Sequence, residues 1–193
     1  MKISRTQNKI IVESEYNWHF VKLARDLAGE WDEKQKTWVF DIRDEADVLE
    51  ACYLSYGEDG IRRNLCDVRM VLPTGWEKVE KAISFFGRTI ARGSMYNNSA
   101  RVAQGVVIKA GGFYAYNTRR SWSTMAEAGT TIILRDVSRP LVDKCIAENI
   151  YDNAIIEILP DARESSRATL IAERNALMER IREIDSLLGD SHV

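Results

Sequence analysis

Aromatic and basic side chains gather in residues 111–122 of this chain, GGFYAYNTRRSW. Exposed aromatic rings can stack on nucleobases, and arginines can neutralise phosphates with release of counterions. The candidate contacts in this stretch are Tyr114, Tyr116, Arg119, Arg120 and Trp122. In a strand, Phe113 and Ala115 would share one face and the two tyrosines the other. The alternative is a β-hairpin whose aromatic side chains face the core while its arginines lie on a solvated rim.

The charge of the chain is concentrated around the same stretch. The 193 residues carry a net charge of −2, from 27 Lys and Arg against 29 Asp and Glu, which excludes a uniformly basic nucleic-acid coat. This near-neutrality is a cancellation, because residues 88–139 carry +6, residues 1–75 carry −3 and residues 140–193 carry −5. Further arginines of the basic segment are expected to join the contact surface: Arg88, Arg92 and Arg101.

Signals for catalysis are few. The chain has no phosphate-binding loop, no dinucleotide fingerprint and no His-Glu-x-x-His pair, and its three cysteines are widely spaced. We therefore expect no catalytic residue, no metal and no cofactor. The order of Arg119-Arg120, residues 121–124 and Glu127 resembles the arginine, serine–threonine and glutamate elements of ADP-ribosyltransferases, which leaves an enzymatic alternative beside that of a polar loop.

The surrounding pattern predicts an α+β fold in three parts. Residues 1–60 are expected to form a small β-α-β-β-α module, in which residues 3–12 form the first strand and Gly29 ends the first helix. Residues 61–160 contain short β-rich segments separated by Gly and Asn turns, which favours a small barrel or a bent sheet. Residues 161–193 predict a long amphipathic helix.

The C-terminal helix has an apolar pattern that could serve a second copy of the chain. Leucine or isoleucine recurs every seven residues, with additional apolar positions four residues later, although Arg174 interrupts the earlier heptad. The residues predicted to form a homodimer are Leu170, Leu177, Ile181, Ile184 and Leu188. The alternative is an amphipathic helix packed against its own domain.

The first module carries a pattern of wider significance, Gly-x-Trp-Asp-x-Lys-x-x-x-Trp-x-Phe, from Gly29 to Phe40. With the aromatic residues before it, this pattern resembles the HARP-like module of annealing helicases and of small phage and plasmid proteins, over about residues 8–57. The resemblance implies an accessory domain that engages branched or partly single-stranded DNA, with Trp38 and Phe40 as the important aromatic pair. The same aromatic residues could instead be the core of a small module.

Together these observations predict a non-enzymatic nucleic-acid-binding accessory protein of a phage or plasmid, with DNA rather than RNA as its ligand. The alternative is a protein that inhibits a host defence complex, of the anti-CRISPR or anti-restriction type, by steric blocking or by mimicry of nucleic acid. We expect a cytoplasmic protein, in the host cytoplasm if phage-encoded, with no membrane segment, because no run of about 18 apolar residues occurs.

Overall fold

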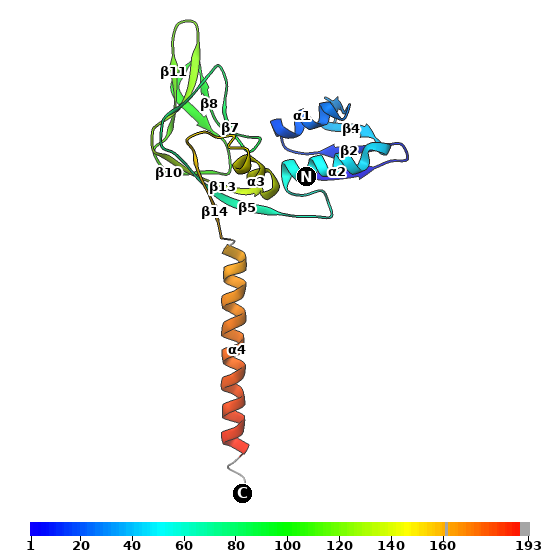
Figure 1. Ribbon diagram of the computed structural model, residues 1–193, viewed down its shortest axis with the longest axis vertical. Helices are drawn as coiled ribbons and strands as arrows, with labels where there is room; N and C mark the ends of the chain where they lie inside the picture. Colours follow the sequence, from blue (N-terminus) through cyan, green and yellow to red (C-terminus); the bar gives the residue numbers. More distant parts are fainter. Residues whose placement is uncertain (161, 190–193) are drawn as a thin grey trace. The chain divides into compact units, whose positions relative to one another are not determined.

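A computed structural model describes the backbone of residues 1–160 and 162–189, and the side chains of these residues apart from 97, 162–169, 183 and 185–189. The chain divides into two compact units, Met1–Leu159 and Pro160–Val193. The larger unit holds all the strands described, and the smaller one holds helix α4 (Ala162–Gly189) (Figure 1).

The larger unit begins with a four-stranded antiparallel sheet of order β1-β2-β4-β3, along which two helices lie (Figure 1). Its elements are β1 (Lys2–Arg5), β2 (Lys9–Glu13), α1 (Trp18–Asp26), β3 (Glu30–Asp32), β4 (Thr37–Asp41), the 3-10 turn η1 (Ile42–Asp44) and α2 (Glu45–Tyr56). The predicted β-α-β-β-α order is wrong at its start, because residues 3–12 form a hairpin rather than one strand. The chain reverses at polar residues 6–8, where the Thr6 amide donates to the Lys9 carbonyl at 2.8 Å.

The core of this first module follows the alternation of its strands. Ile10 and Val12 point inward from β2, and Trp38 and Phe40 do so from β4. The helices contribute Phe20, Ala24, Val48, Ala51 and Cys52 to the same cluster. Helix α1 begins where it does because the Asn17 side-chain oxygen accepts hydrogen bonds from the amides of His19 (2.9 Å) and Phe20 (3.3 Å).

Helix α1 ends in a left-handed residue, but this residue is not the glycine that the sequence predicted. Ala28 has a φ of +53°, whereas the Gly29 amide donates to the Ala24 carbonyl at 2.8 Å. Gly29 is required for space, because a Cβ there would lie 2.4 Å from a Phe40 ring carbon and 2.8 Å from the Ala24 oxygen. The ring of Phe40 therefore occupies the volume that any other side chain at Gly29 would need.

We predict that Gly29→Ala destabilises the chain by about 1–3 kcal/mol, because Phe40 or the end of α1 must shift to admit the methyl group. The matched change Ala28→Gly should instead be neutral or stabilising, since it removes the cost of a left-handed alanine. Urea unfolding followed by circular dichroism measures both. Equal unfolding midpoints for the two variants would contradict this account of the turn.

The rest of the larger unit consists of two further sheets and one helix. A four-stranded sheet has the order β10-β13-β5-β14, and a six-stranded sheet has the order β6-β12-β11-β9-β8-β7. The bounds are β5 (Leu65–Leu72), β6 (Trp76–Val79), β7 (Ile83–Phe85), β8 (Arg88–Ser94), β9 (Asn97–Val102), β10 (Val106–Ala110), β11 (Phe113–Asn117), β12 (Trp122–Ala126), β13 (Thr130–Ser138), α3 (Arg139–Ala147) and β14 (Ile155–Leu159).

Both of these sheets bury side chains in one continuous core. Met70 and Ile132 enter it from the four-stranded sheet, and Phe85 and Ile90 enter it from the six-stranded sheet. Tyr151 closes the cluster, and its hydroxyl accepts a hydrogen bond from the Phe86 amide at 2.7 Å. The second core is separate from that of the first module, since no residue belongs to both clusters.

Two parts of the predicted fold class are corrected. The residues with described side chains are 43% strand and 27% helix, so this part of the chain is β-rich rather than α+β. The second correction concerns the C-terminal helix: the backbone of α4 is helical over residues 162–189, but an amphipathic face can be assessed only over residues 170–182, a run of 13 residues. All of these side chains are exposed, so none of the apolar residues among them is buried within the chain.

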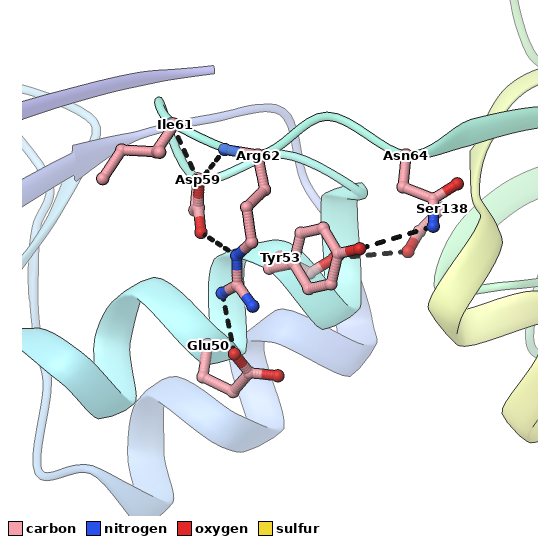
Figure 2. Close-up of polar contacts among 7 residues, drawn as sticks. All are labelled: Glu50, Tyr53, Asp59, Ile61, Arg62, Asn64 and Ser138. Carbon is pink, nitrogen blue, oxygen red and sulfur yellow. Dashed lines mark hydrogen bonds and ion pairs between the residues drawn. The ribbon is translucent and has the colours of Figure 1, made fainter.

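The loop between α2 and β5 is held by Arg62, as Figure 2 shows. Its guanidinium donates to Asp59 and to Glu50, both at 2.7 Å, and lies 3.9 Å from the centre of the Tyr53 ring. The carboxylate of Asp59 is 3% exposed and also accepts the amides of Ile61 and Arg62. This loop is thus rigidly folded although it joins two separate cores.

Hydrogen bonds to backbone carbonyls join the first module to the sheets that follow. The Ser138 hydroxyl, at the start of α3, donates to the Leu54 carbonyl at 2.7 Å. The Trp18 amide donates to the Gly87 carbonyl at 3.0 Å.

Close by, Nδ1 of His19 lies 2.9 Å from the Ser55 hydroxyl. Partial burial lowers the pKa of His19 below 6.5, and the positive charges of Lys144 in α3 and of Lys22 lower it further. Glu148 opposes this shift.

The His19 environment predicts a pH dependence of stability. Because its folded pKa is below its unfolded value, the unfolded chain binds more protons, so stability falls as the pH drops below 6.5. We expect the urea midpoint to decrease between about pH 7 and pH 5, and His19→Gln to reduce that decrease. The control is His192→Gln, at a position outside the described residues. An unchanged pH profile in the His19 variant would contradict the prediction.

Candidate nucleic-acid interface

Strand β11 presents two tyrosines to solvent. Tyr114 is 37% exposed and Tyr116 is 60% exposed, whereas Ala115 between them is 2% exposed. This alternation arises because one face of the strand covers the core and the other does not. The sequence left open whether these tyrosines face solvent or the core, and in the structure they face solvent.

Two hairpin tips lie beside each other at one end of the six-stranded sheet. Strands β8 and β9 are joined by Met95 and Tyr96, and Tyr96 is 95% exposed. Strands β11 and β12 are joined by residues 118–121, a turn closed by the Thr118 amide on the Ser121 carbonyl at 2.8 Å. The side chains of Asn98 and Asn117 meet at 3.5 Å, which links the two hairpins.

Four predicted arginines project from these hairpins. Arg92 of β8 and Arg101 of β9 are directly opposite each other across the strand pair, and Arg119 and Arg120 lie in the second turn. All four are exposed, and within the described part of the chain none of them forms an ion pair. Like charges directly opposite each other destabilise a sheet, so repulsion between Arg92 and Arg101 destabilises the β8–β9 pair when no anion is bound.

A pocket of about 570 Å³ opens between the hairpins and is called here the hairpin pocket. It is lined by residues 92–96 and 99–101 together with Trp122. The guanidinium carbon of Arg92 lies 5.9 Å from the centre of the Trp122 ring. The site thus combines two arginines, an indole ring and the exposed Tyr96, all within the larger unit.

Strands β8 and β12 approach each other closely at Gly93, beside the hairpin pocket. Its amide donates to Thr124 Oγ1 at 2.8 Å, and that hydroxyl donates to the Lys81 carbonyl at 2.7 Å. A Cβ at Gly93 would lie 2.9 Å from the Ser123 oxygen and 3.1 Å from a Trp122 ring carbon. The absence of a side chain at Gly93 therefore lets β8 approach β12 closely enough to place Arg92 over Trp122.

Three of the predicted site residues do not belong to this surface. Trp38 is 8% exposed and Phe40 is 3% exposed, so both are core residues and cannot stack on a base. Trp38 stacks with Phe40 at 6.4 Å between ring centres, which shows that the pair packs internally. Arg88 is half-buried and donates to the Arg135 carbonyl at 2.7 Å, so its guanidinium is already engaged.

The hairpin tips also include Met95, which the sequence analysis did not select, and Tyr96, an aromatic residue of the basic segment that was not among the candidate contacts. Met95 and Tyr96 lie between Gly93-Ser94 and Asn97-Asn98, and these flanking turn signals could have indicated a hairpin with an exposed tip. The pairing of Arg92 with Arg101 had no such signal, because register between strands is not visible in local sequence. The amide of Glu80, the residue after β6, donates to the Trp122 carbonyl at 2.8 Å.

The elements that resemble ADP-ribosyltransferases are not brought together. Arg119 and Arg120 precede β12 and Glu127 follows it, which places them at opposite ends of a strand about 17 Å long. Ser123 and Thr124 are buried, and the hydroxyl of Thr124 serves the backbone contacts described above. This arrangement holds strands together rather than assembling a catalytic group.

Comparisons with known proteins identify no relative: no family model, no curated protein and no solved structure matches the chain. The resemblance of the first module to HARP-like modules therefore remains a prediction. Among the described residues, no helix is long and apolar enough to cross a membrane, and no cluster of three or more His, Cys, Asp or Glu could hold a metal ion.

Proposed function

We propose that the chain is a non-enzymatic nucleic-acid-binding protein whose contact surface is formed by the two hairpin tips. The observation that carries the proposal is the exposed pair Arg92 and Arg101, which face each other without an ion-pair partner among the described residues. A phosphate between them would replace their mutual repulsion by two charge-assisted hydrogen bonds. Arginines of the chain that lie elsewhere, such as Arg62 and Arg69, are held by carboxylates.

Aromatic exposure supports the same conclusion. Tyr96 and Tyr116 are large rings that remain mostly open to solvent, beside the arginines rather than far from them. Rings of this kind stack on bases without regard to sequence, while arginines track the backbone. Arg119 and Arg120 in the second turn extend the basic surface beyond the pocket. We propose DNA as the ligand, and a binding series with RNA tests that choice.

The double variant Arg92→Gln/Arg101→Gln is expected to weaken nucleic-acid binding about tenfold or more at low salt. Because a lost phosphate contact removes about 0.7 from the salt slope for single strands, and the two arginines share one phosphate, the slope should fall by about 0.7. Lys22→Gln/Arg25→Gln removes the same charge from the exposed face of α1 and is expected to change neither quantity. Fluorescence anisotropy with labelled single-stranded, duplex and forked DNA and with RNA, in rising salt, provides the measurement.

Failure of the unmodified chain to bind any of these nucleic acids at low salt would overturn the proposal. If the purified chain binds none of them but retains a host protein at unit stoichiometry after nuclease treatment, the inhibitor of a defence complex becomes the better reading. If Lys22→Gln/Arg25→Gln weakens binding as much as Arg92→Gln/Arg101→Gln does, the nucleic acid is attracted by the total charge of the chain alone. That result would also contradict a dedicated surface at the hairpins.

For helix α4 we propose pairing with a second copy of the chain. Leu170, Leu177 and Ile181 are each more than half exposed, and Ile184 is 42% exposed; the side chain of Leu188 lies outside the described residues. Acidic and basic residues alternate beside this apolar row, so that two copies can match opposite charges. No other described part of the chain carries so many exposed aliphatic side chains on one element.

We expect light scattering to give a mass of twice 22.0 kDa, and Leu177→Asp/Ile181→Asp to halve it, because unpaired carboxylates would be buried in the pair. Ala172→Asp/Asn175→Asp adds the same charge on the opposite side of the helix and should leave the dimer intact. A monomeric unmodified chain at micromolar concentration would refute the pairing.

A further inference from the structure

We propose that the hairpin pocket accepts one unpaired nucleobase, inserted between the Trp122 ring and the Arg92 guanidinium, so that the preferred ligand is single-stranded. This inference rests on the proposed function and goes further by stating which form of nucleic acid is bound and where its base lies. The pocket volume of about 570 Å³ falls within the range of about 300–1,000 Å³ that is usual for small-molecule sites. A base with part of its sugar is therefore of suitable size.

The spacing of the two flat groups supports insertion. Stacked groups in van der Waals contact are about 3.5–4.0 Å apart, so a base between two of them requires roughly 7–8 Å. The guanidinium carbon of Arg92 is 5.9 Å from the centre of the Trp122 ring. This distance is too long for direct stacking, and it is only about 1–2 Å shorter than the distance that an inserted base requires. An exposed arginine side chain supplies that displacement by rotamer adjustment, without movement of the backbone.

Trp122 is the fixed side of this gap. Its carbonyl accepts the Glu80 amide, its strand pairs with β11 opposite Asn117, and its ring lies against Gly93. The buried Thr124 hydroxyl ties β12 to β8 two residues further along. A ring held in this way loses little conformational freedom when a base stacks on it, which favours binding.

The chemistry around the gap distinguishes single strands from duplexes. Bases inside a duplex are covered on both faces by their neighbours, so only an unpaired base can lie against the indole ring. Arg101, directly opposite Arg92 in the strand pair, is placed for the phosphate next to the inserted base. Tyr96, which is almost fully exposed at the rim, can stack on the following base. A duplex would contact the arginines alone.

Three probes of equal phosphate number test the inference: a thymidine oligonucleotide, the same backbone without bases, and a duplex. We expect the thymidine strand to bind the unmodified chain about tenfold or more tightly than the abasic strand, and also more tightly than the duplex. Binding of the thymidine strand should quench tryptophan emission, and Trp122→Phe should remove that quenching while keeping most of the affinity. Trp122→Leu should abolish the preference for bases.

A second variant tests the pocket without substituting Trp122, in case a change at Trp122 disturbs folding. Ala100 lines the hairpin pocket and is half-exposed, so Ala100→Leu adds a bulky side chain to the pocket without changing Trp122. It should reduce thymidine binding to the abasic level and leave abasic and duplex binding unchanged. Thermal unfolding of each variant confirms that the fold is retained.

The outcomes separate the two proposals. Equal affinity for the thymidine, abasic and duplex probes would overturn base insertion and leave the proposed nucleic-acid binding intact. Binding of none of the three would overturn both. A preference for bases that survives both Trp122→Leu and Ala100→Leu would show that stacking takes place elsewhere, and it would refute the assignment to this pocket.

Discussion

The close approach of β8 to β12 at Gly93 is the contact on which the candidate interface depends. Two hydrogen bonds through one buried hydroxyl, that of Thr124, join β8, β12 and the segment after β6. Because an unsatisfied buried hydroxyl or amide is costly, this junction fixes the bend of the six-stranded sheet. The bend brings Arg92 over Trp122 and opens the hairpin pocket beside them.

Two sets of arginines in the described part of the chain have different physical roles. Arg62 is neutralised by Asp59 and Glu50 and stacks on Tyr53, so its role is to hold the loop between the two cores. Arg92 and Arg101 are solvated and face each other across the strand pair, so their mutual repulsion opposes folding. Stability therefore explains the first group, whereas the second is better explained by a ligand that carries negative charge.

The first module shows how far the local pattern can be interpreted. The sequence pattern correctly predicted that this module contains two helices, because amphipathic spacing reports directly on which face is buried. It did not reveal the β1–β2 hairpin, whose short turn has no glycine or proline to mark it. Aromatic spacing singled out Trp38 and Phe40, yet their burial shows that the same rings serve as core.

The sequence by itself determined that Tyr114 and Tyr116 share one face of a strand, and that positive charge is concentrated in residues 88–139, because both are properties of neighbouring residues. Only the tertiary structure decided which arginines are free to meet a ligand. Arg88 is engaged by the carbonyl of Arg135, whereas Arg92 meets Arg101 across β8 and β9 and Trp122 across a bend of the sheet. Register and sheet curvature are set by contacts between distant segments, and a shift of one residue would reverse which side chains face the pocket.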